Sequence, residues 1–201
     1  MEFEHAVRRR RMVRSFTPEL VAPVVVDEIC DLARRAPAAG NTAGVEFLVL
    51  EGDGTMAYWD VTLPVGQREG FAWPGLLAAP VLVVVWTNPG AYLRRYQEPD
   101  KVRTGLGATA EAWPVPYWFV DGGAVVMTML LAAQDRGLGA AFFGMFEHEE
   151  AVRGRFGVPG DRRGIGTVAI GHPAGDDRPS HSAQRGRPDL NEVVHRARWQ
   201  P

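Results

Sequence analysis

The chain reads Arg8-Arg9-Arg10-Arg11-Met12-Val13-Arg14-Ser15-Phe16, followed directly by Thr17-Pro18-Glu19. Because apolar residues are mixed with the five arginines, this stretch is typical of ordered structure and not of a disordered basic arm. Five guanidinium groups within about two helical turns repel one another, so their clustering indicates a bound anion. Phosphate is the best candidate, because the planar, paired donors of arginine match its oxygens. Taken alone, the run fits a solvated helix face about equally well.

The composition of the whole chain limits the kind of anion. The chain of 201 residues has 22 basic and 24 acidic side chains, a formal net charge of -2, which argues against a general nucleic-acid binder. With 46% hydrophobic residues it has enough apolar material for a packed core. We therefore expect a single domain over residues 1–201, with an aromatic-rich excursion at about 88–120 and a C-terminal arm at about 185–201.

Several other classes of protein are disfavoured by the sequence. Cys30 is the only cysteine, so no intrachain disulfide can form. Four of the five histidines, His148, His172, His181 and His195, lack metal-type spacing, and we predict no metal site. The first residues are charged and no segment approaches about 18 uninterrupted apolar residues, so we expect a cytoplasmic protein without a membrane segment.

Apolar periodicity predicts four helices. The first spans about residues 2–11, and the second begins at Pro23 with Val26, Ile29, Cys30 and Ala33 on its inward face. The longest is expected at about 122–136, capped by Asp121 and stopped by Gly137. Because nearly every position from 124 to 133 is apolar, we expect this helix to be buried on all sides. A short helix is expected at 147–156.

Four strands are expected at residues 47–50, 80–87, 140–144 and 167–171. The run at 80–87 is continuously apolar, which predicts a central position in the sheet. Residues 88–116 are rich in glycine, proline and aromatic residues and contain more aromatic side chains than a simple linker needs.

Five segments, in this order along the chain, resemble the nitroreductase family of FMN-dependent oxidoreductases. They are residues 10–16 quoted above, Ala36-Pro37-Ala38-Ala39-Gly40-Asn41, Gly137-Leu138-Gly139 with Phe143-Gly144, Ile170-Gly171-His172-Pro173, and Val193-Val194-His195-Arg196-Ala197-Arg198-Trp199. The resemblance spans nearly the whole chain. It implies an α+β fold with a central, mostly antiparallel sheet flanked by helices, and an intertwined homodimer with two FMN sites at the subunit interface.

The resemblance also implies a set of residues that bind non-covalent FMN. In the motif Arg10-Arg11-Met12, Arg10 maps to a phosphate contact, while Arg14 maps to the cation near the pyrimidine oxygen of the flavin. Arg185 and Arg187 match the basic pair that completes the phosphate site. Phe143 and Gly144 fall where the backbone approaches the hydride-accepting nitrogen. The partner subunit is expected to supply the loop Pro37, Ala38, Ala39, Gly40 and Asn41, with Asn41 as its polar contact.

This chain departs from the family pattern in three places. Met12 stands where relatives commonly have a hydroxyl residue, which removes one phosphate hydrogen bond. Ala43-Gly44 stands where many relatives have Gln and Pro before an aromatic residue. The segment Trp113-Pro114-Val115-Pro116-Tyr117-Trp118 is unlike the commonest nitroreductases and lies where the family varies its substrate cover. Trp113, Tyr117 and Trp118 are therefore candidate substrate-binding residues, and packing at the dimer interface is an equally good interpretation.

The function implied by the resemblance is hydride transfer from NAD(P)H through bound FMN to a nitroaromatic, a quinone or a similar conjugated acceptor. We assign no catalytic side chain, because the flavin carries the chemistry while the protein supplies stacking and positioning. Two alternatives remain open: a flavin-dependent dehydrogenase or oxidase acting on a specialised metabolite, and a flavin-binding protein without turnover.

Overall fold

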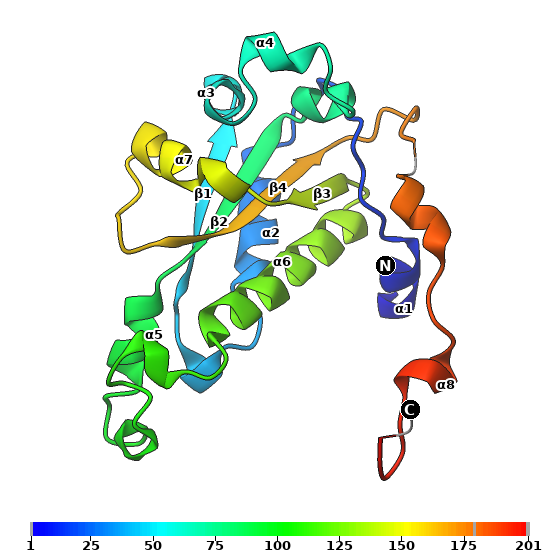
Figure 1. Cartoon of the computed structure of the whole chain (residues 1–201). Coiled ribbons are helices and arrows are strands. Elements are labelled where there is room, and N and C mark those ends of the chain that lie inside the picture. The colour runs from blue at the N-terminus through cyan, green and yellow to red at the C-terminus, as the bar shows by residue number, and fades with distance from the viewer. Residues whose placement is uncertain (1, 179, 200–201) are drawn as a thin grey trace.

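A four-stranded antiparallel sheet forms the centre of the molecule. The computed structural model describes residues 2–178 and 180–199. Its strands β1 (Val45–Glu51), β2 (Val81–Thr87), β3 (Gly139–Phe143) and β4 (Arg163–Gly171) are ordered β1-β2-β4-β3 (Figure 1). The predicted α+β fold with an antiparallel sheet is confirmed. All seven residues of β2 are buried, and its predicted central position is confirmed.

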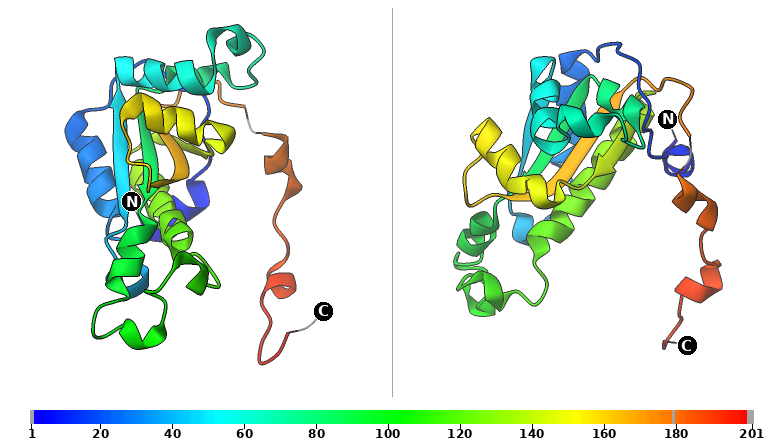
Figure 2. Two further views of the ribbon diagram at one scale, coloured as in Figure 1. Left: turned by 60° about the vertical axis from the view of Figure 1, so that its left-hand side comes forward. Right: turned by 45° about the horizontal axis from the view of Figure 1, so that its top comes forward.

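The apolar run of β2 is continuous because both faces of the sheet are covered by helices. Alternate side chains of a strand point to opposite faces. Val81, Val83 and Val85 pack with helices α2 (Pro23–Ala33) and α6 (Tyr117–Asp135). Leu82, Val84 and Trp86 pack on the other face with α3 (Asp53–Thr62) and α7 (Glu149–Phe156). The sheet is therefore the middle layer of three (Figures 1 and 2).

Shorter elements connect these layers. The helices are α1 (Phe3–Arg9), α4 (Val65–Arg68), α5 (Pro89–Arg95) and α8 (Leu190–Val193), and the 3₁₀ turns are η1 (Ala39–Asn41), η2 (Pro74–Ala78), η3 (Val102–Thr104), η4 (Ala110–Ala112), η5 (Phe146–His148) and η6 (His181–Arg185). The segment after β4 carries η6 and α8, and its end with α8 stands apart from the layered body (Figure 2).

The predicted first helix is wrong at its end. Helix α1 stops at Arg9, and Arg10 adopts φ -56° and ψ 128°, so the rest of the arginine run is extended. The cause is long-range pairing. Met12 forms a parallel bridge with Ala140 of β3, and the N–H of Val13 donates to the carbonyl of Ala140 over 3.0 Å. Pairing to the sheet edge thus overrides local helix propensity.

The predicted cap of the long helix is also wrong. Helix α6 begins at Tyr117, one turn before the expected start, and Asp121 lies inside it with 5% of its surface exposed. The carboxylate of Asp121 accepts hydrogen bonds from the N–H of Ala39 and the hydroxyl of Tyr92, so it serves tertiary contacts instead of the helix end.

Helix α6 is not buried on all sides in this chain. Val120 and Met127, two turns apart on one face, are 50% and 38% exposed. The predicted stop is confirmed, because Gly137 has φ 72° and Leu138 N–H donates to Ala133. The short helix predicted at 147–156 is divided into η5 and α7.

Candidate functional site

The extended arginine segment runs between the edge of the sheet and the chain that leaves β4. Its neighbours are Ala140, bonded to Val13 N–H, and His172, whose carbonyl accepts from Thr17 N–H over 2.9 Å. Val13 is buried against the sheet. Because alternate residues of an extended chain face opposite ways, Met12 and Arg14 are directed to the other side.

Two acidic residues hold the tail over this segment. The N–H of Arg14 donates to the carboxylate of Asp177 over 2.9 Å, and the hydroxyl of Ser15 donates to Asp176 over 2.7 Å. The carbonyl of Ser15 also accepts from Ala174 N–H over 3.0 Å. These bonds bring the residues that follow β4 next to the arginines.

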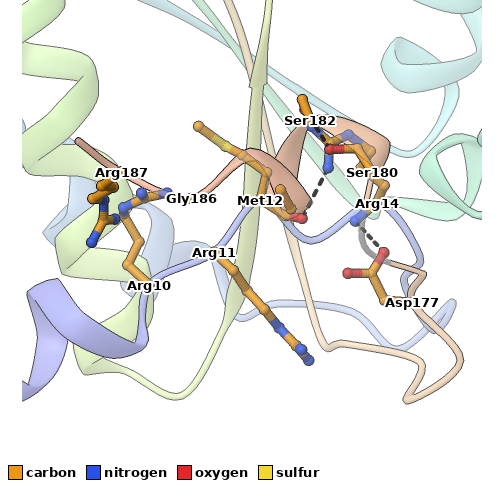
Figure 3. Close-up of a pocket in the computed structure, with 10 residues that line it drawn as sticks. Arg10, Arg11, Met12, Arg14, Asp177, Ser180, Ser182, Gly186 and Arg187 are labelled. Atoms are coloured by element: carbon orange, nitrogen blue, oxygen red, sulfur yellow. Dashed lines mark hydrogen bonds between the residues drawn. The ribbon is translucent and has the colours of Figure 1, made fainter. Parts of the chain in front are cut away.

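The resulting cavity has a volume of about 770 Å³ and is strongly basic. Its described lining contains four arginines and one carboxylate. In the view of Figure 3, Arg10 lies near Arg187, Arg14 lies near Asp177, and Arg11 points away from both groups. The lining consists of Arg10, Arg11, Met12, Arg14, Asp177, Ser180, Ser182, Ala183, Gly186 and Arg187. Arg187 thus lines the same cavity as the first motif, and their joint contact with a phosphate stays a prediction.

Arg10 has unsatisfied hydrogen-bond donors in this cavity. Its Nε and Nη1 atoms are buried, and neither has a hydrogen-bond partner among the described residues. A buried charged donor without a partner costs free energy, so such groups are normally paired. The phosphate of FMN has the charge and the oxygen atoms that these donors lack, and the residues present therefore fit that group.

An aromatic cavity of about 310 Å³ adjoins the basic one at Arg14, which lines both. Trp59 and Phe143 stack there with ring centroids 5.7 Å apart, and the guanidinium of Arg14 lies 4.9 Å from the ring centroid of Trp73. Phe143 and Gly144, the predicted flavin contacts, both line this cavity. A flat ring system with a phosphate tail fits two such cavities joined at one arginine.

Met12 occupies the hydroxyl position of the motif in an unexpected way. Its sulfur lies 3.4 Å from the backbone nitrogen of Phe142 and accepts a hydrogen bond from it. The side chain therefore connects the basic cavity to the strand that leads to Phe143.

Other predicted site residues lie elsewhere in the chain. Arg185 is exposed in η6 and is absent from the described lining of the basic cavity. Pro37 lines a different cavity, of about 570 Å³, next to α1. Ala38 precedes the turn η1, which contains Ala39, Gly40 and the exposed Asn41 and packs beside α5 and α6. One chain therefore does not bring its loop 37–41 into its own basic cavity.

The three candidate substrate residues are not equivalent. Trp113 and Trp118 are each 6% exposed and pack around the buried ring of Tyr92. Tyr117 is 44% exposed at the start of α6. In the single chain, the faces of the two tryptophans contact other side chains and Tyr117 is accessible.

Sequence reasoning missed several residues that line the two cavities. In the basic cavity these are Asp177, Ser180 and Ser182, whose only sequence signal is a polar tail after β4. In the aromatic cavity they are Tyr58, Trp59, Phe71, Trp73, Phe146 and His148. The adjacent pair Tyr58-Trp59 was a usable signal for an aromatic site, but nothing local connects it to Phe143.

Three further observations concern metal ligands, membrane-spanning helices and the cysteine. No group of His, Cys, Asp or Glu suited to a metal ion occurs within residues 2–178 and 180–199. In the same part of the chain no helix is both long enough and apolar enough to cross a membrane. Cys30 is half-buried, and burial together with Asp27 raises the pKa of its thiol to about 11.

Comparisons with known proteins agree with this geometry. The sequence model of the Nitroreductase family matches residues 7–172. The chain is 28% identical to a 4-nitrobenzoate reductase of Nocardioides sp. (strain LMS-CY), covering 85% of this chain and 80% of that protein. It is 25% identical to an Archaeoglobus fulgidus protein with the provisional name NADH dehydrogenase/NAD(P)H nitroreductase, covering 94% of each.

Solved structures share the fold. A nitroreductase family protein from Streptococcus pneumoniae TIGR4 superposes with a TM-score of 0.74 at 19% identity, covering 96% of this chain and 99% of that one. A provisionally named nitroreductase from Exiguobacterium sibiricum 255-15, solved in complex with FMN, gives a TM-score of 0.71 at 20% identity, covering 100% and 98%.

Proposed function

The chain belongs to the nitroreductase family and is an oxidoreductase, and from this premise we propose that it binds FMN non-covalently and reduces a conjugated acceptor with NAD(P)H. The observation that carries the proposal is the pair of buried donors on Arg10 that find no partner among the described residues, at a cavity lined by four arginines. A terminal phosphate would satisfy those donors and offset the repulsion among the guanidinium groups.

The predicted cofactor-binding residues then have distinct proposed roles. Arg10 and Arg187 would hold the phosphate. Arg11 points away from these two side chains and Arg185 lies outside the described lining, so both would join the phosphate site only after rearrangement on binding. Met12 would lie beside the ribityl chain of FMN, and Arg14 would face the pyrimidine edge of the flavin ring. A cation at that edge stabilises negative charge on the reduced ring. Phe143 and Gly144 line the aromatic cavity and would lie against the ring, where they would exclude water from one of its faces.

Bound FMN supplies hydride chemistry, because it accepts two electrons from a reduced nicotinamide and donates them to an acceptor. The chain contributes binding and orientation. Tyr58 is unsuited to act as a general acid near neutral pH. Burial raises its pKa to about 12, although the hydrogen bond with Thr167 lowers it in part. His148 lines the same cavity.

We further propose a homodimer in which each chain completes the flavin site of the other. Support comes from the exposed apolar face of α6, with Val120 and Met127, and from the exposed Val193 and Trp199 near the end of the chain. The loop 37–41 lies away from the basic cavity of its own chain, so it serves the flavin of a second copy.

The acceptor is proposed to be a flat, conjugated molecule such as a nitroaromatic or a quinone. The name of the Nocardioides relative makes a nitrobenzoate the first compound to try. Tyr117 is the accessible member of the aromatic excursion and is the proposed substrate contact among the three, with Trp113 and Trp118 behind it.

Anaerobic spectroscopy of the purified protein tests the proposal directly. We expect bound cofactor that runs as FMN after heat release, bleaching on addition of NADH or NADPH, and steady-state turnover with 4-nitrobenzoate or a quinone. Cofactor that ran as FAD, or protein that could not be loaded with FMN, would contradict it. Ring reduction without turnover would favour a flavin-binding protein, and electron transfer to oxygen from another metabolite would favour an oxidase.

A further inference from the structure

The turn η1 has a backbone that requires support. Gly40 and Asn41 both have positive φ, 64° and 55°. Glycine adopts the left-handed region freely, so any cost falls on Asn41, and such a conformation persists where the surroundings enforce it. Contacts from α5 and α6 hold the turn in this conformation.

Asp121 of α6 holds the start of the turn. Its Oδ2 accepts hydrogen bonds from the N–H of Ala39 and from the hydroxyl of Tyr92, both over 2.8 Å. Asp121 is 5% exposed and Tyr92 is fully buried. Burial is the larger cause and the hydrogen-bonded Asp121 carboxylate the second, and together they raise the pKa of Tyr92 far above its usual value. The hydroxyl therefore stays protonated and keeps donating to the carboxylate.

Arg95 of α5 holds the middle of the turn. Its Nε donates to the carbonyl of Gly40 over 2.8 Å, while Nη1 and Nη2 donate to the two carboxylate oxygens of Asp100 over 2.7 Å each. The bidentate pair with Asp100 raises the pKa of Arg95 and orients its guanidinium. Two helices therefore hold the backbone of the turn: α6 binds the N–H of Ala39, and α5 binds the carbonyl of Gly40.

The backbone at Gly40 and Gly44 also packs closely against aromatic rings at α5. A Cβ atom at Gly40 would lie 2.9 Å from the ring of Tyr96, and one at Gly44 would overlap the ring of Tyr92. The presence of glycine at position 44, a departure from the family pattern, is explained by the space that Tyr92 takes. Trp113 packs edge-on against Tyr96 with ring centroids 4.6 Å apart, so it supports α5 from behind.

We propose that Tyr92, Arg95 and Asp121 are positioning residues that hold η1 so that Asn41 meets the FMN of the partner chain. This inference rests on the proposed function, in which Asn41 contacts that flavin. The aromatic excursion then serves cofactor binding, and its buried tryptophans act by packing instead of by stacking on a substrate.

A double-mutant cycle on the full-length protein tests the inference. Arg95→Ala, Asn41→Ala and the double variant are titrated with FMN by fluorescence. Each single variant should raise the Kd of FMN about tenfold, as expected for one lost charge-assisted or polar contact. The double variant should bind about as weakly as either single one, because Arg95 acts through Asn41. The matched control Arg94→Ala, exposed on the same helix, should leave the Kd unchanged.

The remaining readouts separate positioning from general stability. At saturating FMN, Arg95→Ala should melt within about 2 °C of the wild type, whereas a purely structural role would lower the melting temperature. Tyr92→Phe keeps the ring and removes the hydroxyl, and it should also weaken FMN binding. Unchanged Kd values, or additive effects of Arg95→Ala and Asn41→Ala, would overturn the inference. Arg10→Ala distinguishes the two levels: if it weakens FMN while Arg95→Ala does not, only the positioning role fails, and if neither does, the proposed function fails as well.

Discussion

The individual arginines of residues 8–14 have different surroundings and should respond differently to mutation. Arg8 is exposed and pairs with Glu4 on α1, whereas Arg10 lines the basic cavity with buried donors that have no partner in the described part of the chain. We predict that Arg10→Ala weakens FMN binding by about 1.5–3 kcal/mol, one to two decades in Kd. Arg8→Ala is the control and should change little. Fluorescence titration of FMN gives both values, and equal, small effects would mean that the run is a solvated surface.

Arg14 should differ in kind from Arg10, because it lines both cavities and lies by the proposed position of the ring. Removing this cation takes away stabilisation of the reduced, negatively charged ring. We expect Arg14→Ala to lower the flavin reduction potential and to slow hydride transfer even at saturating FMN, while saturating FMN largely rescues Arg10→Ala. Potentiometric titration and stopped-flow reduction measure these effects. Rescue of both variants by FMN would remove the distinction.

The pH dependence of thiol labelling at Cys30 is a further prediction for a single residue. Burial and Asp27 raise the pKa of its thiol to about 11, so the protonated form dominates in the folded protein well above neutrality. Only the thiolate reacts with disulfide reagents. We expect the labelling rate of folded protein to keep rising from about pH 8 to pH 10, whereas the unfolded chain should level off above its ordinary pKa of about 8.5. Levelling of both at the same pH would contradict this.

At the scale of elements, truncating a side chain of β2 should lower the free energy of unfolding far more than truncating one of its neighbour β1. Val83 of β2 is fully buried and pairs directly with Val49 of β1, which is 39% exposed. Val83→Ala removes two buried methyl groups and leaves a cavity, so we expect a loss of about 2–3 kcal/mol. Val49→Ala, the matched control, should cost less than about 1 kcal/mol. Denaturant midpoints at fixed protein and FMN concentrations provide the comparison, and equal losses would argue against the three-layer arrangement.

At the scale of the whole molecule, the exposed face of α6 should be an interface. Val120 is 50% exposed in the single chain, so a charge there would be harmless in a monomer. We predict that Val120→Glu breaks the homodimer and releases FMN, because the partner's loop no longer reaches the flavin. Light scattering and the ratio of flavin to protein absorbance measure both effects.

The control for this prediction is Val102→Glu. Val102 is similarly exposed, at 53%, but lies in η3 and not on the face of α6. It should leave the mass and the flavin content unchanged. A Val120→Glu variant that stayed dimeric with full flavin content would place the interface elsewhere.

The sequence alone was sufficient for the parts of the molecule that depend on short-range patterns. The apolar run of β2 predicted a central strand, and the spacing of Val26, Ile29 and Ala33 predicted the buried face of α2. The segment of residues 10–16 and the later motifs identified the family. Periodicity of two or 3.6 residues is a local property, and it is visible because each strand or helix buries one side against the sheet.

Only the tertiary structure decided how separate segments meet. Arg14 bonds to Asp177, 163 residues later, and Ala39 bonds to Asp121, 82 residues later. The early end of α1 and the tertiary role of Asp121 likewise depend on partners from other elements. A hydrogen bond between distant residues leaves no periodic trace in the sequence, because its formation depends on where the folded backbone brings the two groups.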